Sequence, residues 1–108
     1  MIIQALTITK DNFDKEVMQS DKPVLLDFWS PTCGPCMMIG PTIDEIAAEQ
    51  TDVKVGKVNV MDEPELTAAF GVVSIPMLVV IKDGEVINQD IGAKKKSAIL
   101  QMLTPVTA

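Results

Sequence analysis

The sequence predicts an α/β fold in which a central mixed β-sheet is flanked by helices on both faces. Segments with strand and helix patterns alternate along most of the 108 residues, which favours parallel pairing of strands. The run 24–29 is apolar at all but one position, as is typical of a central strand covered from both sides. Asp83-Gly84 separates two further strand-like runs and indicates a hairpin, which adds antiparallel strands. We expect residues 1–108 to form a single domain.

The first strand is expected over 2–8, where apolar and polar residues alternate weakly. Thr9 then has the character of a helix cap, because Asp11 and Asp14 follow it in what would be the first turn. The turn-forming cluster 20–23 ends this helix. The chain therefore opens with one strand and one helix.

The strand 24–29 leads into a long helix over 35–50, where apolar residues recur at helical spacing. Pro41 should kink this helix, because proline lacks an amide hydrogen and crowds the preceding turn. A third strand follows over 53–60, and its alternation places Lys57 on an otherwise apolar face.

The last third of the chain begins with a short helix that starts near Glu63 and ends at Gly71. The runs 77–81 and 85–91 form the strands of the hairpin. A final amphipathic helix is expected over 95–103.

The composition excludes several classes of site. The formal net charge is −6 and the chain has no arginine, so it is a poor candidate for binding nucleic acid. The cluster Lys94-Lys95-Lys96 is interpreted as a solvated helix start. Histidine is absent, which removes the commonest general base and any zinc site that contains it. No apolar run approaches the roughly 20 residues of a membrane span, no secretory signal is expected, and the seven methionines are interpreted as core filler.

The only two cysteines, Cys33 and Cys36, are separated by Gly34 and Pro35. Residues three apart on a helix have Cβ atoms roughly 5–6 Å apart, so this pair can switch between dithiol and disulfide with little backbone movement. Cys33 falls at the predicted helix N-terminus, where free amides and the helix dipole favour the reactive thiolate. Gly34 allows another chain to approach, and Pro35 stiffens the bridge. The pattern favours a redox-active dithiol, because so short a loop stabilises little as a cross-link.

Other interpretations of the cysteine pair remain open at this point. A C-x-x-C pair can be half of a zinc site, but zinc takes four ligands and the chain has no histidine and no third cysteine. We therefore expect no metal site within one chain, although a dimer could share four thiolates. Two inert core cysteines are a further alternative, and the Gly-Pro bridge argues against it.

Asp27 is the single charged residue of the strand 24–29, and alternation predicts that it is buried. Burial should raise its pKa, and a carboxyl beneath the dithiol could accept the proton of Cys36. A hydrogen-bonded structural carboxyl is the alternative. Lys57 either extends to solvent or pairs with Asp27 across neighbouring strands and tunes its pKa.

These residues together resemble the thioredoxin family, and the match runs nearly end to end. It comprises Asp27-Phe28-Trp29, Cys33-Gly34-Pro35-Cys36, Pro41, Lys57, Gly71, Ile75-Pro76, Asp83-Gly84 and Gly92. The resemblance implies the thioredoxin fold and a thiol–disulfide oxidoreductase that reduces protein disulfides. It also implies a part in electron transport and cell redox homeostasis.

The resemblance implies a role for each residue of the site. Cys33 would attack a client disulfide, and Cys36 would resolve the resulting mixed disulfide. Asp27, with Lys57, resembles the buried proton acceptor of the family. Pro76 resembles the family's cis-proline opposite the dithiol, although sequence alone gives a cis X-Pro bond a frequency of only about one in twenty. Supporting positions of the active site are Trp29, Gly34, Pro35 and Pro76.

The resemblance also implies an apolar docking surface for clients. It comprises Thr32, Val73, Ile75, Gly92 and Ala93, beside Trp29. The sequence departs from the family pattern at several positions near the site, where Ser30-Pro31 replaces a usual alanine and a variable residue. Thr32 replaces a usual tryptophan, Met37 a usual lysine or arginine, Met61 a usual aspartate and Met77 a common threonine. These departures suggest an altered recognition face with the catalytic groups retained.

The resemblance further implies a cytoplasmic monomer with no bound cofactor, whose disulfide is reduced by an external reductase. That partner would be an NADPH-dependent flavoprotein or a ferredoxin-linked thioredoxin reductase, and the other partners would be disulfide-containing clients. Two rival functions use the same fold: an oxidase or isomerase, and a binding module whose redox activity is incidental. The Gly-Pro bridge favours the reductase, since reductants and oxidants of this type differ in reduction potential.

Overall fold

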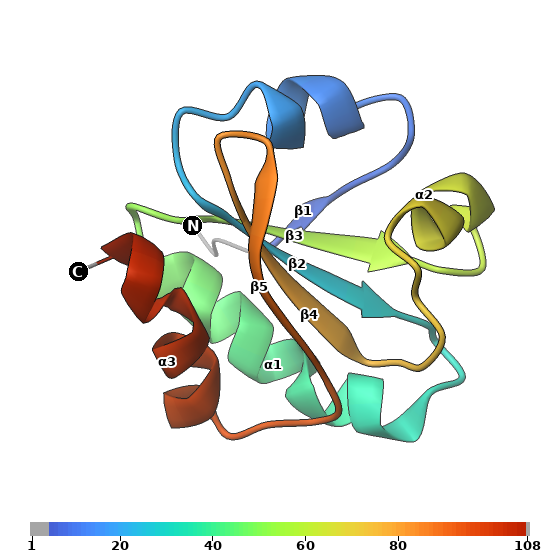
Figure 1. Ribbon diagram of the computed structural model, residues 1–108. Helices are drawn as coiled ribbons and strands as arrows, with labels where there is room; N and C mark the ends of the chain where they lie inside the picture. Colours follow the sequence, from blue (N-terminus) through green and yellow to red (C-terminus); the bar gives the residue numbers. More distant parts are fainter. Residues whose placement is uncertain (1–4, 108) are drawn as a thin grey trace.

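The computed structural model describes residues 5–107, which form a five-stranded sheet with helices on both faces (Figure 1). The strands are β1 (Leu6–Thr7), β2 (Val24–Trp29), β3 (Lys54–Asn59), β4 (Met77–Lys82) and β5 (Glu85–Ile91). The helical elements are the π-helical turn η1 (Asp14–Met18), α1 (Gly34–Glu49), α2 (Pro64–Ala69) and α3 (Lys96–Thr107).

The strands follow the order β1-β3-β2-β4-β5, so β2 is the central strand. It runs parallel to β3 and antiparallel to β4, which confirms the predicted mixed sheet. Phe28 near the end of β2 pairs with Met77 at the start of β4. The loop after β2 and the loop before β4 therefore lie at the same end of the sheet (Figure 1).

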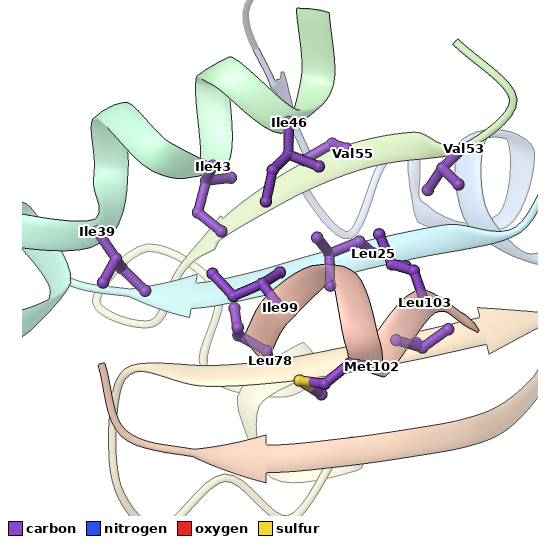
Figure 2. Packing of buried hydrophobic residues seen from close by; sticks show 11 residues of the cluster. Leu25, Ile39, Ile43, Ile46, Val53, Val55, Leu78, Ile99, Met102 and Leu103 are labelled. Atoms are coloured by element: carbon purple, nitrogen blue, oxygen red, sulfur yellow. The ribbon is translucent and has the colours of Figure 1, made fainter. Parts of the chain in front are cut away.

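Two apolar cores hold the helices against the sheet. Helices α1 and α3 cover one face (Figure 2), and η1 and α2 cover the other. The α1–α3 core contains Leu25, Ile39, Ile43, Ile46, Val53, Val55, Leu78, Val80, Ile99, Met102 and Leu103. The η1–α2 core contains Ile8, Val17, Val24, Leu26, Phe28, Val58, Leu66, Met77, Val79 and Ile81. Burial of each large side chain contributes roughly 1.5–3 kcal/mol, so the α1–α3 core fixes the position of α1 over the sheet.

The predicted hairpin is confirmed, with Asp83 and Gly84 as its two central residues. Both have positive φ angles, 52° and 77°, as a tight two-residue turn between twisted strands requires. Gly71, which was expected to end the third helix, also has a positive φ of 62° and follows α2. The hairpin turn and the end of α2 therefore lie where the sequence predicted them.

The beginning of the chain differs from the prediction. Strand β1 covers only two residues of the expected range 2–8, of which 2–4 lie outside the described residues. At Thr9, the side chain of Asn12 accepts a hydrogen bond from the Thr9 amide at 2.8 Å, and the Thr9 carbonyl accepts one from the Phe13 amide at 2.9 Å. A side chain three residues along that bonds the amide of the cap residue is one half of a capping box, so these contacts fit a turn that starts at Thr9. The regular element η1 begins later, at Asp14.

The last helix is longer than the expected range 95–103. It continues to Thr107 and passes through Pro105. The carbonyl that loses a partner at Pro105 is that of the exposed Gln101, which water can satisfy. The hydroxyl of Thr107 bonds the Leu103 carbonyl at 2.9 Å and supports the added turn.

Two expectations about side chains need correction. Met18, Met37, Met38 and Met61 are exposed, so the interpretation of the methionines as core filler fits only Met77 and Met102 among the described residues. In the lysine cluster, Lys94 forms an ion pair with Asp90, and Lys96 forms ion pairs with Glu45 and Glu49. Among the described helices, none has the length and apolar character needed to cross a bilayer.

Candidate active site

The two cysteines form a disulfide at the start of α1, with their Cα atoms 5.2 Å apart. Cys33 is the N-cap residue of the helix, and its Sγ accepts a hydrogen bond from the Cys36 amide at 3.2 Å. Cys33 is partly exposed, whereas Cys36 is only 2% exposed. An incoming molecule can therefore reach Cys33, while Cys36 faces the interior.

The loop before β4 faces the disulfide from a distant part of the sequence. The Ile75–Pro76 peptide bond is cis, and the Ile75 carbonyl oxygen lies 3.9 Å from the Cys33 Sγ. The Pro76 carbonyl accepts a hydrogen bond from the Gly92 amide at 2.8 Å. The dithiol, the cis-proline and Gly92 are thus brought together at one end of the sheet.

Asp27 lies in the centre of the sheet on the α1 side, and it is 1% exposed. Its Oδ1 accepts no hydrogen bond from any residue within 5–107. Burial raises the pKa of Asp27 from 3.8 to about 7, because removal from water penalises the charged carboxylate. The positive charge of Lys57 acts to lower this pKa, and the negative charge of Asp44 acts to raise it.

Of the two alternatives for Lys57, the structure favours the side chain that extends toward solvent, and within residues 5–107 it forms no ion pair with Asp27. The two residues are neighbours in register on β2 and β3, but the Lys57 ammonium pairs with Asp44 of α1, with 3.2 Å between Nζ and Oδ1. The side chains of Lys57 and Asp44 are 22% and 33% exposed. Lys57 thus partly reaches solvent, and a second carboxylate holds its charge there.

A pocket of about 280 Å³ joins these groups beneath the disulfide. It is lined by Asp27, Trp29, Cys36, Met37, Gly40, Pro41, Asp44 and Lys57. The pocket gives Cys36 and Asp27 a shared environment through which a proton could pass. Among residues 5–107, no three His, Cys, Asp or Glu side chains are placed to hold a metal ion together.

Asp44 is the charged residue of this pocket that was not predicted from the sequence. A signal for it exists, because Cys36, Gly40 and Asp44 are spaced four residues apart and so follow one side of a helix. Because Cys36 faces the sheet, Gly40 and Asp44, which follow it on the same side of α1, should face the sheet as well. This spacing places a second carboxylate over the strand that carries Lys57.

The expected docking residues lie on loops at the disulfide end of the sheet and differ in exposure. Val73 is 89% exposed, and Thr32 and Ala93 are also exposed. Ile75 and Gly92 are partly buried. The Thr32 hydroxyl lies 3.2 Å from that of the buried Ser30, which ties this residue to the loop before the dithiol.

The chain resembles known proteins along nearly its whole length. A sequence model of the thioredoxin family matches residues 4–105. Thioredoxin from Mycobacterium bovis is 45% identical over 102 residues, which cover 94% of this chain and 88% of the relative. Thioredoxin 1 from Synechococcus elongatus is 43% identical over 100 residues, which cover 92% of this chain and 94% of the relative. Thioredoxin from Streptomyces clavuligerus is 42% identical over 94 residues, which cover 87% and 88% respectively.

Proposed function

Because this chain belongs to the thioredoxin family and is a thiol–disulfide oxidoreductase that reduces protein disulfides, we propose that Cys33 is its nucleophile and Cys36 its resolving thiol. The observation that carries this assignment is the hydrogen bond from the Cys36 amide to the Cys33 Sγ at the helix N-terminus. An amide donor and the helix dipole both favour a thiolate at Cys33. The burial of Cys36 supports its use only after a client is attached to Cys33.

The reaction begins with the reduced protein. The Cys33 thiolate attacks one sulfur of the client disulfide, which forms a mixed disulfide and releases the other client sulfur as a thiolate. Cys36 then loses its proton and attacks the Cys33 sulfur. The Cys33–Cys36 disulfide forms, and the second client sulfur leaves as a thiolate. The client gains two electrons and the protein loses two.

Asp27 accepts the proton of Cys36 in this proposal. The carboxyl and the cysteine line the same pocket, and no hydrogen bond within residues 5–107 occupies Asp27 Oδ1. A pKa of about 7 suits a group that must take up and release a proton near neutral pH. Lys57 tunes this group by its charge, without a direct ion pair.

The oxidised protein needs electrons from outside to begin another cycle. We propose an external thioredoxin reductase as the donor, either an NADPH-dependent flavoprotein or a ferredoxin-linked enzyme, and disulfide-containing proteins as clients. A protein that donates electrons to disulfides suits the reducing cytoplasm, where it would contribute to redox homeostasis. The surface of Thr32, Val73, Ile75, Gly92 and Ala93 is proposed to bind the client next to Cys33, and the exposure of Val73 supports this use.

The experiment that tests the assignment is the reduction of insulin in the presence of dithiothreitol. We expect Cys33→Ser to lose at least roughly a thousandfold in rate, because no mixed disulfide can form without the nucleophile. A Cys33→Ser variant as active as the natural protein would remove Cys33 from this role.

The same assignment predicts that Cys36→Ser traps clients. A mixed disulfide at Cys33 would persist, since no second thiol is present to resolve it, and dithiothreitol would release the client. The double variant Cys33→Ser/Cys36→Ser is the matched control and should capture nothing. Covalent capture by the double variant would show that the linkage does not involve Cys33.

A further inference from the structure

Asp44 is held in place from two sides, although it lies on a partly exposed part of α1. Its Oδ1 accepts a hydrogen bond from the Ala5 amide at 3.1 Å and lies 3.2 Å from the Lys57 Nζ. The backbone amide fixes the carboxylate, since Ala5 directly precedes β1, which is held in the sheet by its pairing with β3. Asp44 is therefore a fixed negative charge and not a freely moving surface side chain.

Lys57 is drawn toward this fixed charge. The nearest heavy atom to a Cβ built on Gly40 would be the Lys57 Nζ, at 3.8 Å, so the ammonium lies against α1 where the helix carries no side chain. Lys57 is nevertheless the register partner of Asp27 on the adjacent parallel strand. The side chain thus has two carboxylates within its surroundings and pairs with the more exposed one.

Among residues 5–107, the charged groups that act on Asp27 are Lys57 and Asp44. Lys57 faces it from β3, and Asp44 faces the same pocket from α1, together with Cys36. On the remaining side, the register partner of Asp27 on β4 is the apolar Leu78. The state of the Asp27 carboxyl therefore depends on where the Lys57 ammonium is held.

We infer that Asp44 is a positioning residue for the proton transfer: its carboxylate holds the Lys57 ammonium on the solvent side of the pocket and so keeps it off Asp27. This inference rests on the proposed role of Asp27 as the acceptor of the Cys36 proton. A Lys57 ammonium free to turn toward Asp27 would bind the carboxylate and stabilise its charged form. Asp27 would then be a weaker base when Cys36 needs to lose its proton.

The test is Asp44→Asn, which preserves the shape and the acceptor for the Ala5 amide but removes the charge. The protonation of Asp27 is followed by the NMR titration of its carboxyl carbon in the oxidised protein, which requires no catalysis. We expect the titration midpoint to fall by roughly 0.5 pH unit or more. The pH profile of insulin reduction should shift in the same direction, while Asp44→Glu should restore both midpoints.

Glu45→Gln is the matched control, because it removes the same charge from the next residue of α1. Glu45 pairs with Lys96 on α3 and does not line the pocket. We expect this variant to leave the Asp27 midpoint within about 0.1–0.2 pH unit of the natural value, since exposed charges are screened by salt. An equal shift in both variants would mean that only the total charge of the protein matters.

A second comparison separates the holding of Lys57 from direct repulsion between the two carboxylates. In a Lys57→Met background, Asp44→Asn should shift the Asp27 midpoint by less than half as much as it does in the natural protein. An equal shift in both backgrounds, or no shift in either, would overturn the inference.

The two proposals can fail separately. If Asp27→Asn leaves the pH profile of insulin reduction unchanged, Asp27 is not the proton acceptor, whatever the NMR titration shows. If Asp27→Asn alters that profile but Asp44→Asn leaves the titration of Asp27 in place, the acceptor role stands and the positioning role of Asp44 is wrong.

Discussion

Two regions meet at the Cys33–Cys36 disulfide and are built in opposite ways. The Asp27 pocket, formed by Asp27 with Lys57, Asp44 and Cys36, lies beneath the disulfide between the sheet and α1. The client rim, formed by the proposed docking residues Thr32, Val73, Ile75, Gly92 and Ala93, lies around it on the surface. Asp27 is 1% exposed and Val73 is 89% exposed.

The difference shows which part of the site is constrained by folding. A charged or polar group in the pocket changes the stability of the protein because burial penalises its ionisation. A substitution at an exposed position of the rim, such as Val73, exchanges one solvated side chain for another and typically changes stability by less than about 0.5 kcal/mol. Among the departures from the family pattern, Thr32, Met37 and Met61 are exposed. Met77 packs in the η1–α2 core.

The comparison predicts its largest effect for Asp27→Asn. Well below pH 3.8 the carboxyl is protonated in both the folded and the unfolded protein, so its ionisation makes no contribution to the free energy of unfolding. As the pH rises from 3.8 toward 7, the unfolded chain releases the proton first, and the folded protein loses stability. The complete penalty is about 4 kcal/mol.

The variant lacks this penalty. Its unfolding free energy relative to the natural protein should therefore rise by about 4 kcal/mol between pH 4 and pH 8, as measured by urea unfolding of the oxidised proteins. Asp52→Asn removes the same charge from an exposed turn and should give a nearly constant difference. If the difference in unfolding free energy between Asp27→Asn and the natural protein also stayed constant with pH, the contrast between pocket and rim would be wrong.

On the rim, Val73→Ser should weaken client binding without affecting the fold. Burial of the valine against a client would contribute up to roughly 1.5 kcal/mol, so the KM for a protein disulfide should rise by up to about tenfold. The rate with a small-molecule disulfide should stay unchanged. Val86→Ser is the matched control, because Val86 is also apolar and 49% exposed but lies on the edge strand β5. An equal rise in KM for Val86→Ser would show that Val73 does not contact the client specifically.

The smallest expected effect is a gain of function on the rim. Thr32→Trp restores the apolar area that the family pattern usually has there, so the KM for a protein disulfide should fall by about two- to fivefold. Thr51→Trp places the same side chain on an exposed turn at the other end of the sheet and should leave KM unchanged. An equal fall in KM for Thr51→Trp, or no fall for Thr32→Trp, would show that position 32 does not take part in client binding.

Much of this architecture could be predicted because it is encoded locally. The alternation around Asp27 revealed a buried acid, and Asp83-Gly84 specified its own turn. The spacing of the cysteines revealed the dithiol. Each of these signals lies within a few residues of the feature that it predicts.

The remainder depends on packing between layers. The partner of Lys57 is supplied by α1, so the alternation of β3 alone could not identify it. The cis bond before Pro76 has a low frequency for any X-Pro pair, and only the family resemblance pointed to it. The helix beyond Leu103 is stabilised by Thr107 and by packing of Val106, which outweigh the breaking signal of a proline.

The hydrogen bond between the Cys36 amide and the Cys33 sulfur has an evolutionary consequence. Position 33 must begin a helix, and serine is among the residues best suited to that task. A change from cysteine to serine would therefore abolish electron transfer while leaving the start of α1 supported. The cap at the start of α1 would survive the loss of the redox chemistry, so a descendant that only binds clients would be a single substitution away.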